Sequence, residues 1–125
     1  MMLYKNVDIT DLESIIKNGI LPMNKCKNNN WGDGKRSNNS TAVVYLFKPT
    51  TKINTFPNYG IALLEVECEA TENKMAENDI HKDDYIEYVV EEVKPEQIRK
   101  VIIPKIFKDR ITLSENIRVE LCEMY

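Results

Sequence analysis

The sequence predicts a single α+β domain, spanning residues 1–125, in which a small split sheet of about six strands, antiparallel or mixed, carries one clear N-terminal helix. Three observations lead to this prediction. The opening segment combines a strand with a well-bounded helix, and most later apolar runs are short and rich in β-branched or aromatic residues. A chain of 125 residues is also long enough for one modest core.

The opening segment is predicted to form a strand over 3–7 followed by a helix. Thr10 and Glu13 have the spacing of a capping box, which satisfies the first backbone N–H groups of a helix. Asn18-Gly19 supplies a left-handed C-terminal cap, and Pro22 prevents the helix from resuming. Apolar residues at helical spacing give this helix one buried face: Leu12, Ile15 and Ile16.

Five later segments are predicted strands, because they are β-branched and aromatic or alternate apolar with polar residues. They are 41–47, 61–69, 85–90, 99–104 and 117–124. A period of two places Tyr85, Glu87 and Val89 on one side of their strand. Of the connections, 50–60 fits an irregular crossover or one helical turn, 72–77 has a weak helical-turn pattern, and 106–111 is ambiguous.

Composition argues against several classes of function. A net charge of −3 gives no overall attraction to nucleic acid. The three cysteines are widely spaced without a CxxC motif, so neither a disulfide framework nor a zinc site is expected, and His81 is the single histidine. No apolar run approaches the roughly eighteen residues of a membrane span, and no signal peptide is recognised. We therefore expect a cytoplasmic protein without a membrane partner or a bound metal.

The polar stretch 24–40 is long for a loop in a small domain, and such loops are often functional lids. Trp31, Lys35 and Arg36 within it suggest a basic loop that stacks on a base, clamps a phosphate or contacts an acceptor. The alternative is a solvated surface loop whose tryptophan packs on the core. Cys26, between two lysines, is a weaker candidate for a reactive thiolate.

Two patterns bring a resemblance to a known family. Tyr4-Lys5, then Asp11-Leu12 and Asn18-Gly19-Ile20, is similar to the opening of the ADP-ribosyltransferase-like fold, most of all to its DNA-modifying, DarT-like branch. In that branch an Arg, a Thr and a His follow the Tyr, whereas Lys5, Val7 and Asp8 take these positions here.

The second pattern lies around Glu87. The segment IEYVVEEVKPEQIRKVIIP resembles the strand that carries the essential glutamate of the family, with Glu87 in that position. Oxocarbenium charge develops on the ribose when the dinucleotide is cleaved, and a carboxylate in a low-dielectric cleft would stabilise it. Ser40 and Thr41 resemble the Ser-Thr pair of the middle motif, but Phe47 stands where the family has a small residue.

The resemblance implies a fold that takes NAD as a substrate and transfers ADP-ribose to a protein or nucleic-acid acceptor. Glu87 and Lys5 would be catalytic and would meet across one cleft, with Lys5 orienting the diphosphate. Lys5 lacks the bidentate fork of the Arg it replaces. Residues implied in nucleotide binding are Tyr4, Lys5, Asn6, Thr41, Tyr45 and Tyr59.

Two alternatives stay open. The departures at Lys5, Val7, Asp8 and Phe47 are typical of a non-catalytic binder of a nucleotide or a protein, such as a phage-type antagonist of a host defence component. The acidic strand face at Glu65, Glu67 and Glu69 would be its first surface to test. An RNA 2′-phosphotransferase of the same fold fits less well, because it wants more basic and histidine character than one His81 provides.

Overall fold

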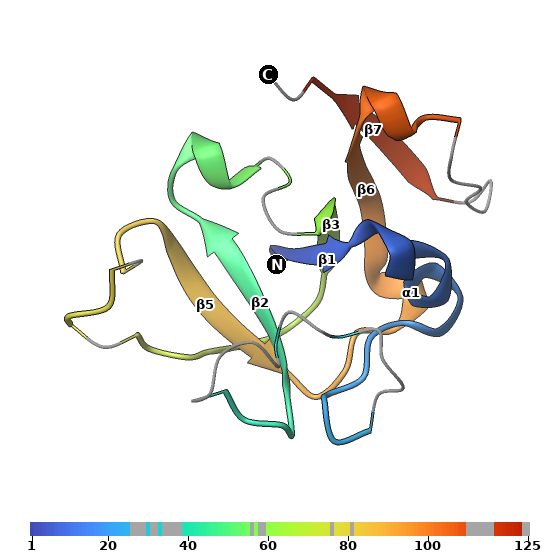
Figure 1. Cartoon of the computed structure of the whole chain (residues 1–125). Coiled ribbons are helices and arrows are strands. Elements are labelled where there is room, and N and C mark those ends of the chain that lie inside the picture. The colour runs from blue at the N-terminus through green and yellow to red at the C-terminus, as the bar shows by residue number, and fades with distance from the viewer. Residues whose placement is uncertain are drawn as a thin grey trace.

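The computed structural model describes residues 1–25, 30, 33, 39–55, 57, 60–75, 77–80, 82–109 and 117–123. Seven strands form one sheet in the order β4-β5-β2-β1-β3-β6-β7, and every pairing is antiparallel except that of β6 with β7 (Figure 1). This confirms the predicted α+β class with a mixed sheet. The strands are β1 (Met2–Asp8), β2 (Val44–Pro49), β3 (Ile61–Glu67), β4 (Thr71–Glu72), β5 (Tyr85–Val90), β6 (Ile98–Pro104) and β7 (Arg118–Cys122).

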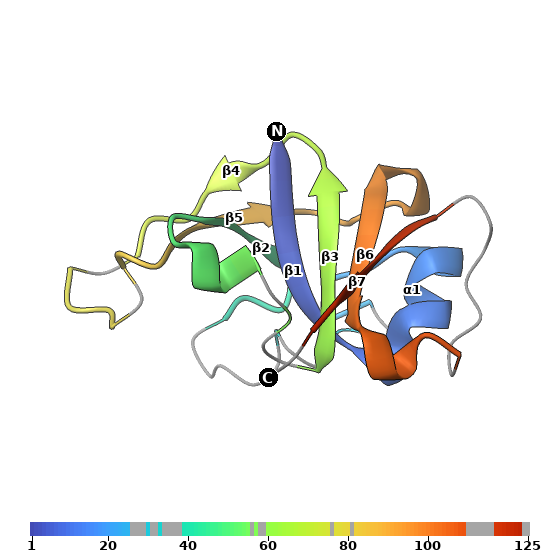
Figure 2. The ribbon, with the colours of Figure 1, turned by 90° about the horizontal axis from the view of Figure 1, so that it is seen from above.

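The sheet is weakly joined at its centre. β1 pairs with β3 along its whole length, from Met2 to Asp8, whereas β1 and β2 are paired only at Tyr4 and Phe47. Figure 2 shows the result: β5 runs across the direction of β1 and β3, so the sheet is strongly twisted. The strands β4, β5 and β2 therefore form one half of the sheet, and β1, β3, β6 and β7 form the other.

The helix α1 (Leu12–Asn18) follows a 3₁₀ turn, η1 (Ile9–Asp11), and its start differs from the prediction. The Thr10 hydroxyl and N–H both donate to Asp8 Oδ1, at 2.7 and 2.9 Å, so Asp8 caps η1 and the predicted capping box of Thr10 and Glu13 is wrong. Asp8 immediately precedes η1, so its carboxylate is placed to accept from the Thr10 N–H, which has no backbone partner at the start of the turn. Gly19, as predicted, ends the helix with a φ of 75° and its N–H bonded to Ile15 O.

One face of the sheet, which we call the helix face, packs against α1. Leu3 and Val7 of β1 lie in the same buried cluster as Leu12 and Ile15 of α1. Side chains alternate along a strand, so Lys5 shares the helix face with Leu3 and Val7. Other members of this cluster are Val44, Leu46, Ala62, Leu64, Val66, Val101 and Ile103.

The opposite face, the outer face, carries Tyr4, Asn6 and their cross-strand partners. It is not uniformly exposed, because Leu63 and Ile102, a cross-strand pair on this face, are 0% and 6% exposed. No helix of the described residues has the length and apolar character needed to cross a membrane.

Most predicted elements appear with shifted ends. Strand β5 matches 85–90, but β2 begins three residues later than predicted and includes Pro49. The helical turn expected around 72–77 is wrong where the structure describes it, because Thr71–Glu72 pairs with β5 as a strand. Three further 3₁₀ turns connect the strands: η2 (Lys52–Thr55), η3 (Pro95–Gln97) and η4 (Lys105–Phe107).

Candidate functional site

The outer face of β5, β2 and β1 gathers most of the predicted site residues. Glu87 of β5 is the partner of Phe47 of β2, and Phe47 is the partner of Tyr4 of β1, so the three side chains form one row. Asn6 and Tyr45 lie two positions away on their strands and project to the same face. The sheet thus brings together residues that are widely separated in sequence.

Glu87 is only 4% exposed, which is rare for a carboxylate within a strand. Its Oε1 accepts a hydrogen bond from Asn73 Nδ2 at 2.7 Å, and its backbone C=O accepts from Asn73 N at 2.8 Å. Asn73 follows the short strand β4 and so fixes the carboxylate from the edge of the sheet. A buried carboxylate with a defined hydrogen bond is held in one orientation.

Aromatic rings flank Glu87. The ring centroid of Phe47 lies 5.4 Å from that of Tyr85 and 6.2 Å from that of Tyr4, in tilted arrangements. All three side chains are partly exposed. They therefore form a half-open aromatic wall beside a buried carboxylate, a combination that suits the flat ring of a base and the charge of a ribosyl centre.

The row continues to the other half of the sheet as a polar chain. The Tyr4 hydroxyl donates to Glu65 Oε2 at 3.2 Å, and Lys100 Nζ lies 3.3 Å from Glu65 and 2.6 Å from Glu120. Burial raises the pKa of Tyr4, and the neighbouring Glu65 carboxylate raises it further. The hydrogen bond to Glu120 raises the pKa of the Lys100 ammonium more than partial burial lowers it.

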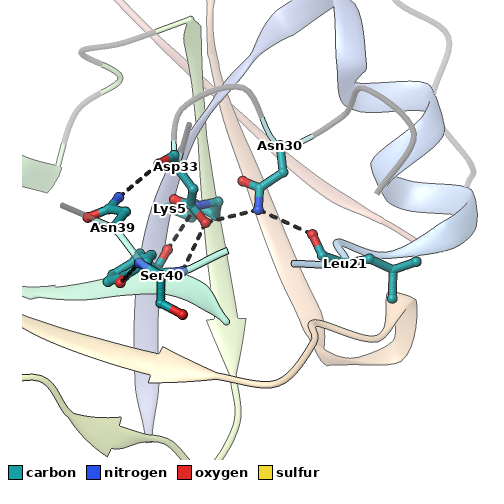
Figure 3. Close-up of polar contacts among 7 residues, drawn as sticks. Lys5, Leu21, Asn30, Asp33, Asn39 and Ser40 are labelled. Carbon is teal, nitrogen blue, oxygen red and sulfur yellow. Dashed lines mark hydrogen bonds and ion pairs between the residues drawn. The ribbon is translucent and has the colours of Figure 1, made fainter. Parts of the chain in front are cut away.

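Lys5 has a different environment. Its Nζ donates to Asp33 Oδ1 at 2.6 Å and to the Tyr45 C=O at 2.9 Å, and Lys5 and Asp33 are each 5% exposed. Figure 3 shows the Lys5 and Asp33 side chains pointing toward each other. Asp33 Oδ2 also accepts from the Tyr45 N–H at 3.1 Å. Asp33 and Lys5 thus bond the Tyr45 backbone at a position where β1 is not paired with β2.

Two asparagines complete this cluster around Asp33. Asn30 Nδ2 donates to Asp33 Oδ2 at 2.9 Å and to the Leu21 C=O at 3.2 Å, and Asn39 Nδ2 donates to the Asp33 C=O at 2.9 Å (Figure 3). Asn30 is 2% exposed, and its Oδ1 has no hydrogen-bond donor among the described residues. The cluster fastens residues 30 and 33 of the polar stretch to the sheet.

The expectation that Lys5 and Glu87 meet across one cleft is wrong. Tyr4, Phe47 and Glu87 share the outer face, and Lys5, the next residue after Tyr4, projects to the helix face. The sheet therefore lies between the ammonium and the carboxylate. The catalytic roles of Lys5 and Glu87 stay predictions. Because the two side chains lie on opposite faces of the sheet, they do not act on one atom from a shared cleft.

The remaining predicted residues fall into two groups. Thr41 is exposed in a turn, where its C=O accepts from the Asn24 N–H at 2.9 Å, and the Tyr45 hydroxyl accepts from the Ser40 N–H at 2.7 Å. Trp31, Lys35, Arg36 and Tyr59, together with Cys26 and His81, lie outside the described residues. Within the described ranges, no three His, Cys, Asp or Glu side chains are grouped as a metal site requires.

Sequence reasoning missed Asp33, Asn30 and Asn73. Asp33 precedes a glycine, which is typical of an exposed turn, and Asn73 stands in a charged stretch without periodicity. Asp33 and Asn73 each bond a side chain that is distant in sequence. Lys5 is 28 positions from Asp33, and Glu87 is 14 positions from Asn73, so local patterns do not reveal either contact.

No family model matches the sequence, and no curated protein matches it. A solved structure with a similar fold is that of Thermosipho africanus DarTG in complex with ADP-ribose, with a TM-score of 0.58 and 15% sequence identity. The similarity covers 96% of this chain and 49% of that chain, so this chain spans about half the length of its neighbour. At this identity the likeness shows the fold alone: the mixed α+β fold of this chain is similar to that of the neighbour.

Proposed function

We propose that the protein binds an ADP-ribose-type nucleotide, with NAD as the donor substrate, on the outer face of β5, β2 and β1. The observation that carries the proposal is the row of Glu87, Phe47 and Tyr4, a buried carboxylate beside half-exposed rings. The fold likeness to a structure in complex with ADP-ribose supports the same ligand class.

In this proposal, different residues of the row contact different parts of the nucleotide. The rings of Phe47, Tyr4 and Tyr85 stack on nicotinamide or adenine, and Glu87 faces the ribose. During transfer, the bond from nicotinamide to the ribose carbon breaks and positive charge develops on the ribose, which the fixed carboxylate stabilises. In this proposal Lys5 is a positioning residue that holds Asp33 against the Tyr45 backbone of β2.

A titration with ADP-ribose followed by calorimetry tests binding. Phe47→Ala should raise the dissociation constant about two- to tenfold, the value of one aromatic contact of about 0.5–1.5 kcal/mol. A second variant, Glu87→Gln, removes the charge of the buried carboxylate. Its matched control is Glu13→Gln, because Glu13 is an exposed carboxylate on α1. Absence of heat on adding ADP-ribose or NAD, at protein concentrations that detect millimolar affinity, would rule out the proposed ligand class.

Transfer is tested with labelled NAD and cell extract. We expect label on a macromolecule with the unaltered protein and with Glu13→Gln, and none with Glu87→Gln. Binding without transfer would leave the ligand assignment standing and refute the enzymatic part.

A non-catalytic nucleotide binder is the second candidate, and one observation favours it. Lys100, the lysine in the outer-face row, is held between Glu65 and Glu120, and Lys5 is committed to Asp33. Neither lysine can therefore assist Glu87 in transfer unless its ion pairs open, whereas stacking of a base on the aromatic rings does not need either lysine. Tight binding of ADP-ribose with no transfer by either the unaltered protein or Glu13→Gln would support this candidate.

A further inference from the structure

One hollow among the described residues is lined by neither Lys5 nor Glu87. It is an open groove of about 550 Å³ between the segment that follows β3, from Cys68 to Thr71, and the end of β5, from Val89 to Glu92. We call it the β3–β5 groove. It adjoins β4, one of the two edge strands of the sheet, and none of its lining residues belongs to the proposed nucleotide site.

The floor of the β3–β5 groove is apolar and its rim is acidic. Val43, Cys68 and Val90 contribute apolar surface, and Cys68 is only 8% exposed. Burial raises the pKa of the Cys68 thiol, so the floor carries no thiolate at neutral pH. The groove thus offers apolar side chains beside its charged ones.

Three carboxylates and one ammonium stand around this floor: Glu69, Glu91, Glu92 and Lys94. The Glu91 and Glu92 side chains are exposed and have no hydrogen bond or ion pair within the described part of the chain. Glu69 lies 3.9 Å from the N-terminal ammonium, with its own side chain 96% exposed. Two uncommitted negative charges beside an apolar floor select a positively charged partner.

We propose that the β3–β5 groove binds an extended polypeptide segment that alternates basic and apolar residues. The apolar side chains would contact the floor at Val43 and Val90, and the basic side chains would face Glu91 and Glu92. A nucleic acid is disfavoured, because its phosphates would meet the same carboxylates. The short outer strand β4 leaves backbone groups at the sheet edge beside the groove, where an extended segment can lie.

The test uses the full chain and fluorescein-labelled peptides of about ten residues, long enough to extend along the groove as a strand. One peptide alternates lysine and leucine, a second replaces leucine by serine, and a third replaces lysine by glutamate. Fluorescence polarisation should give tightest binding for the first peptide. The glutamate peptide should not bind, and the affinity of the first should fall as salt rises.

Two double variants separate the groove from general charge attraction. Glu91→Gln with Glu92→Gln should weaken binding of the lysine-leucine peptide at least about fivefold. Glu13→Gln with Glu77→Gln removes the same charge from exposed positions outside the groove and should change it less than about twofold. Thermal melting of each variant confirms that the fold is retained.

If both double variants lost the same affinity for the lysine-leucine peptide, the proposal would be overturned, because the net charge of the protein alone would then explain the binding. Equal binding of the serine and leucine peptides would also overturn it, since the apolar floor would then have no part. Absence of binding by the lysine-leucine peptide at millimolar concentration would do the same. None of these measurements requires nucleotide, so their outcome is independent of the proposed NAD site.

Discussion

Lys5 Nζ lies 2.6 Å from Asp33 Oδ1, and both side chains are only 6% exposed although 28 positions separate the residues. A buried ion pair of this kind gains little over an apolar pair, but removal of one partner leaves an unpaired charge in the interior. The pair is therefore a strong constraint on which sequences can adopt this fold.

We expect Lys5→Met to lower the free energy of unfolding by about 3–5 kcal/mol, because the Asp33 carboxylate would stay buried without its ammonium partner. Urea denaturation measures the change. Adding Asp33→Asn to this variant should recover part of the loss, since the amide can still accept from the Tyr45 N–H. If Lys5→Met alone left the urea midpoint unchanged, the ion pair of Lys5 and Asp33 would not form in solution.

The stability of the protein should fall at alkaline pH. Burial and Glu65 raise the pKa of Tyr4 above 10.0 in the folded state. The stabilisation by this group is full below the unfolded pKa and is lost as pH rises through the folded pKa, because the unfolded chain releases the proton more readily. Lys100, whose pKa is raised mainly by its hydrogen bond to Glu120, contributes with the same sign.

Tyr4→Phe isolates the tyrosine contribution. Free energies of unfolding of the unaltered protein and of Tyr4→Phe, measured between about pH 9 and 12, should converge as pH rises. Parallel curves would show that Tyr4 titrates alike in the folded and unfolded states.

Gly60→Ala should be strongly destabilising. Gly60 has a φ of 67°, and an added Cβ would lie 2.3 Å from the Val7 C=O oxygen, which belongs to backbone that cannot easily shift. We expect a loss of more than about 1 kcal/mol from the positive φ alone, with the clash adding to it. Thermal unfolding checks this against Ser14→Ala on the exposed side of α1. Similar melting temperatures for the two variants would contradict the tight approach of Gly60 to β1.

Asn73→Ala removes the Nδ2 donor of the 2.7 Å hydrogen bond to Glu87. Because Glu87 is 4% exposed, its carboxylate would lose a partner that water replaces poorly, and we expect a loss of about 1–3 kcal/mol in stability. Glu72→Gln, the exposed neighbouring residue, is the control. If Glu87 also contacts ribose, Asn73→Ala weakens ADP-ribose binding, whereas Glu72→Gln does not.

Local sequence signals predicted most elements of the fold. The strand at 85–90, predicted from its β-branched and aromatic residues, has the predicted bounds, and Gly19 takes the positive φ that a helix-ending glycine favours. The predicted capping box is wrong because Asp8, two residues earlier, accepts from the Thr10 N–H and hydroxyl, so Thr10 does not act as the cap. Both residues are good caps, so sequence alone did not separate the two arrangements.

The relation between Lys5 and Glu87 depended on register, which local patterns do not specify. A slip of one residue between two strands moves every side chain to the other face. The cross-strand pairs of Tyr4 with Phe47 and of Phe47 with Glu87 place Glu87 on the face opposite to Lys5. Each pair joins distant parts of the chain. The burial of Asp33 was equally hidden, because its reason is Lys5 and not its own neighbours.

The single residue pair between β1 and β2 has a mechanical consequence. Elsewhere in the sheet, adjacent long strands are joined by ladders of backbone bonds. Between β1 and β2 there is one paired position, and the Lys5 ammonium and the Asp33 carboxylate add bonds to the Tyr45 backbone. Side chains, as well as the backbone, therefore contribute to the angle between the two halves of the sheet. Exchanges at two positions in evolution could change that angle while every strand keeps its length.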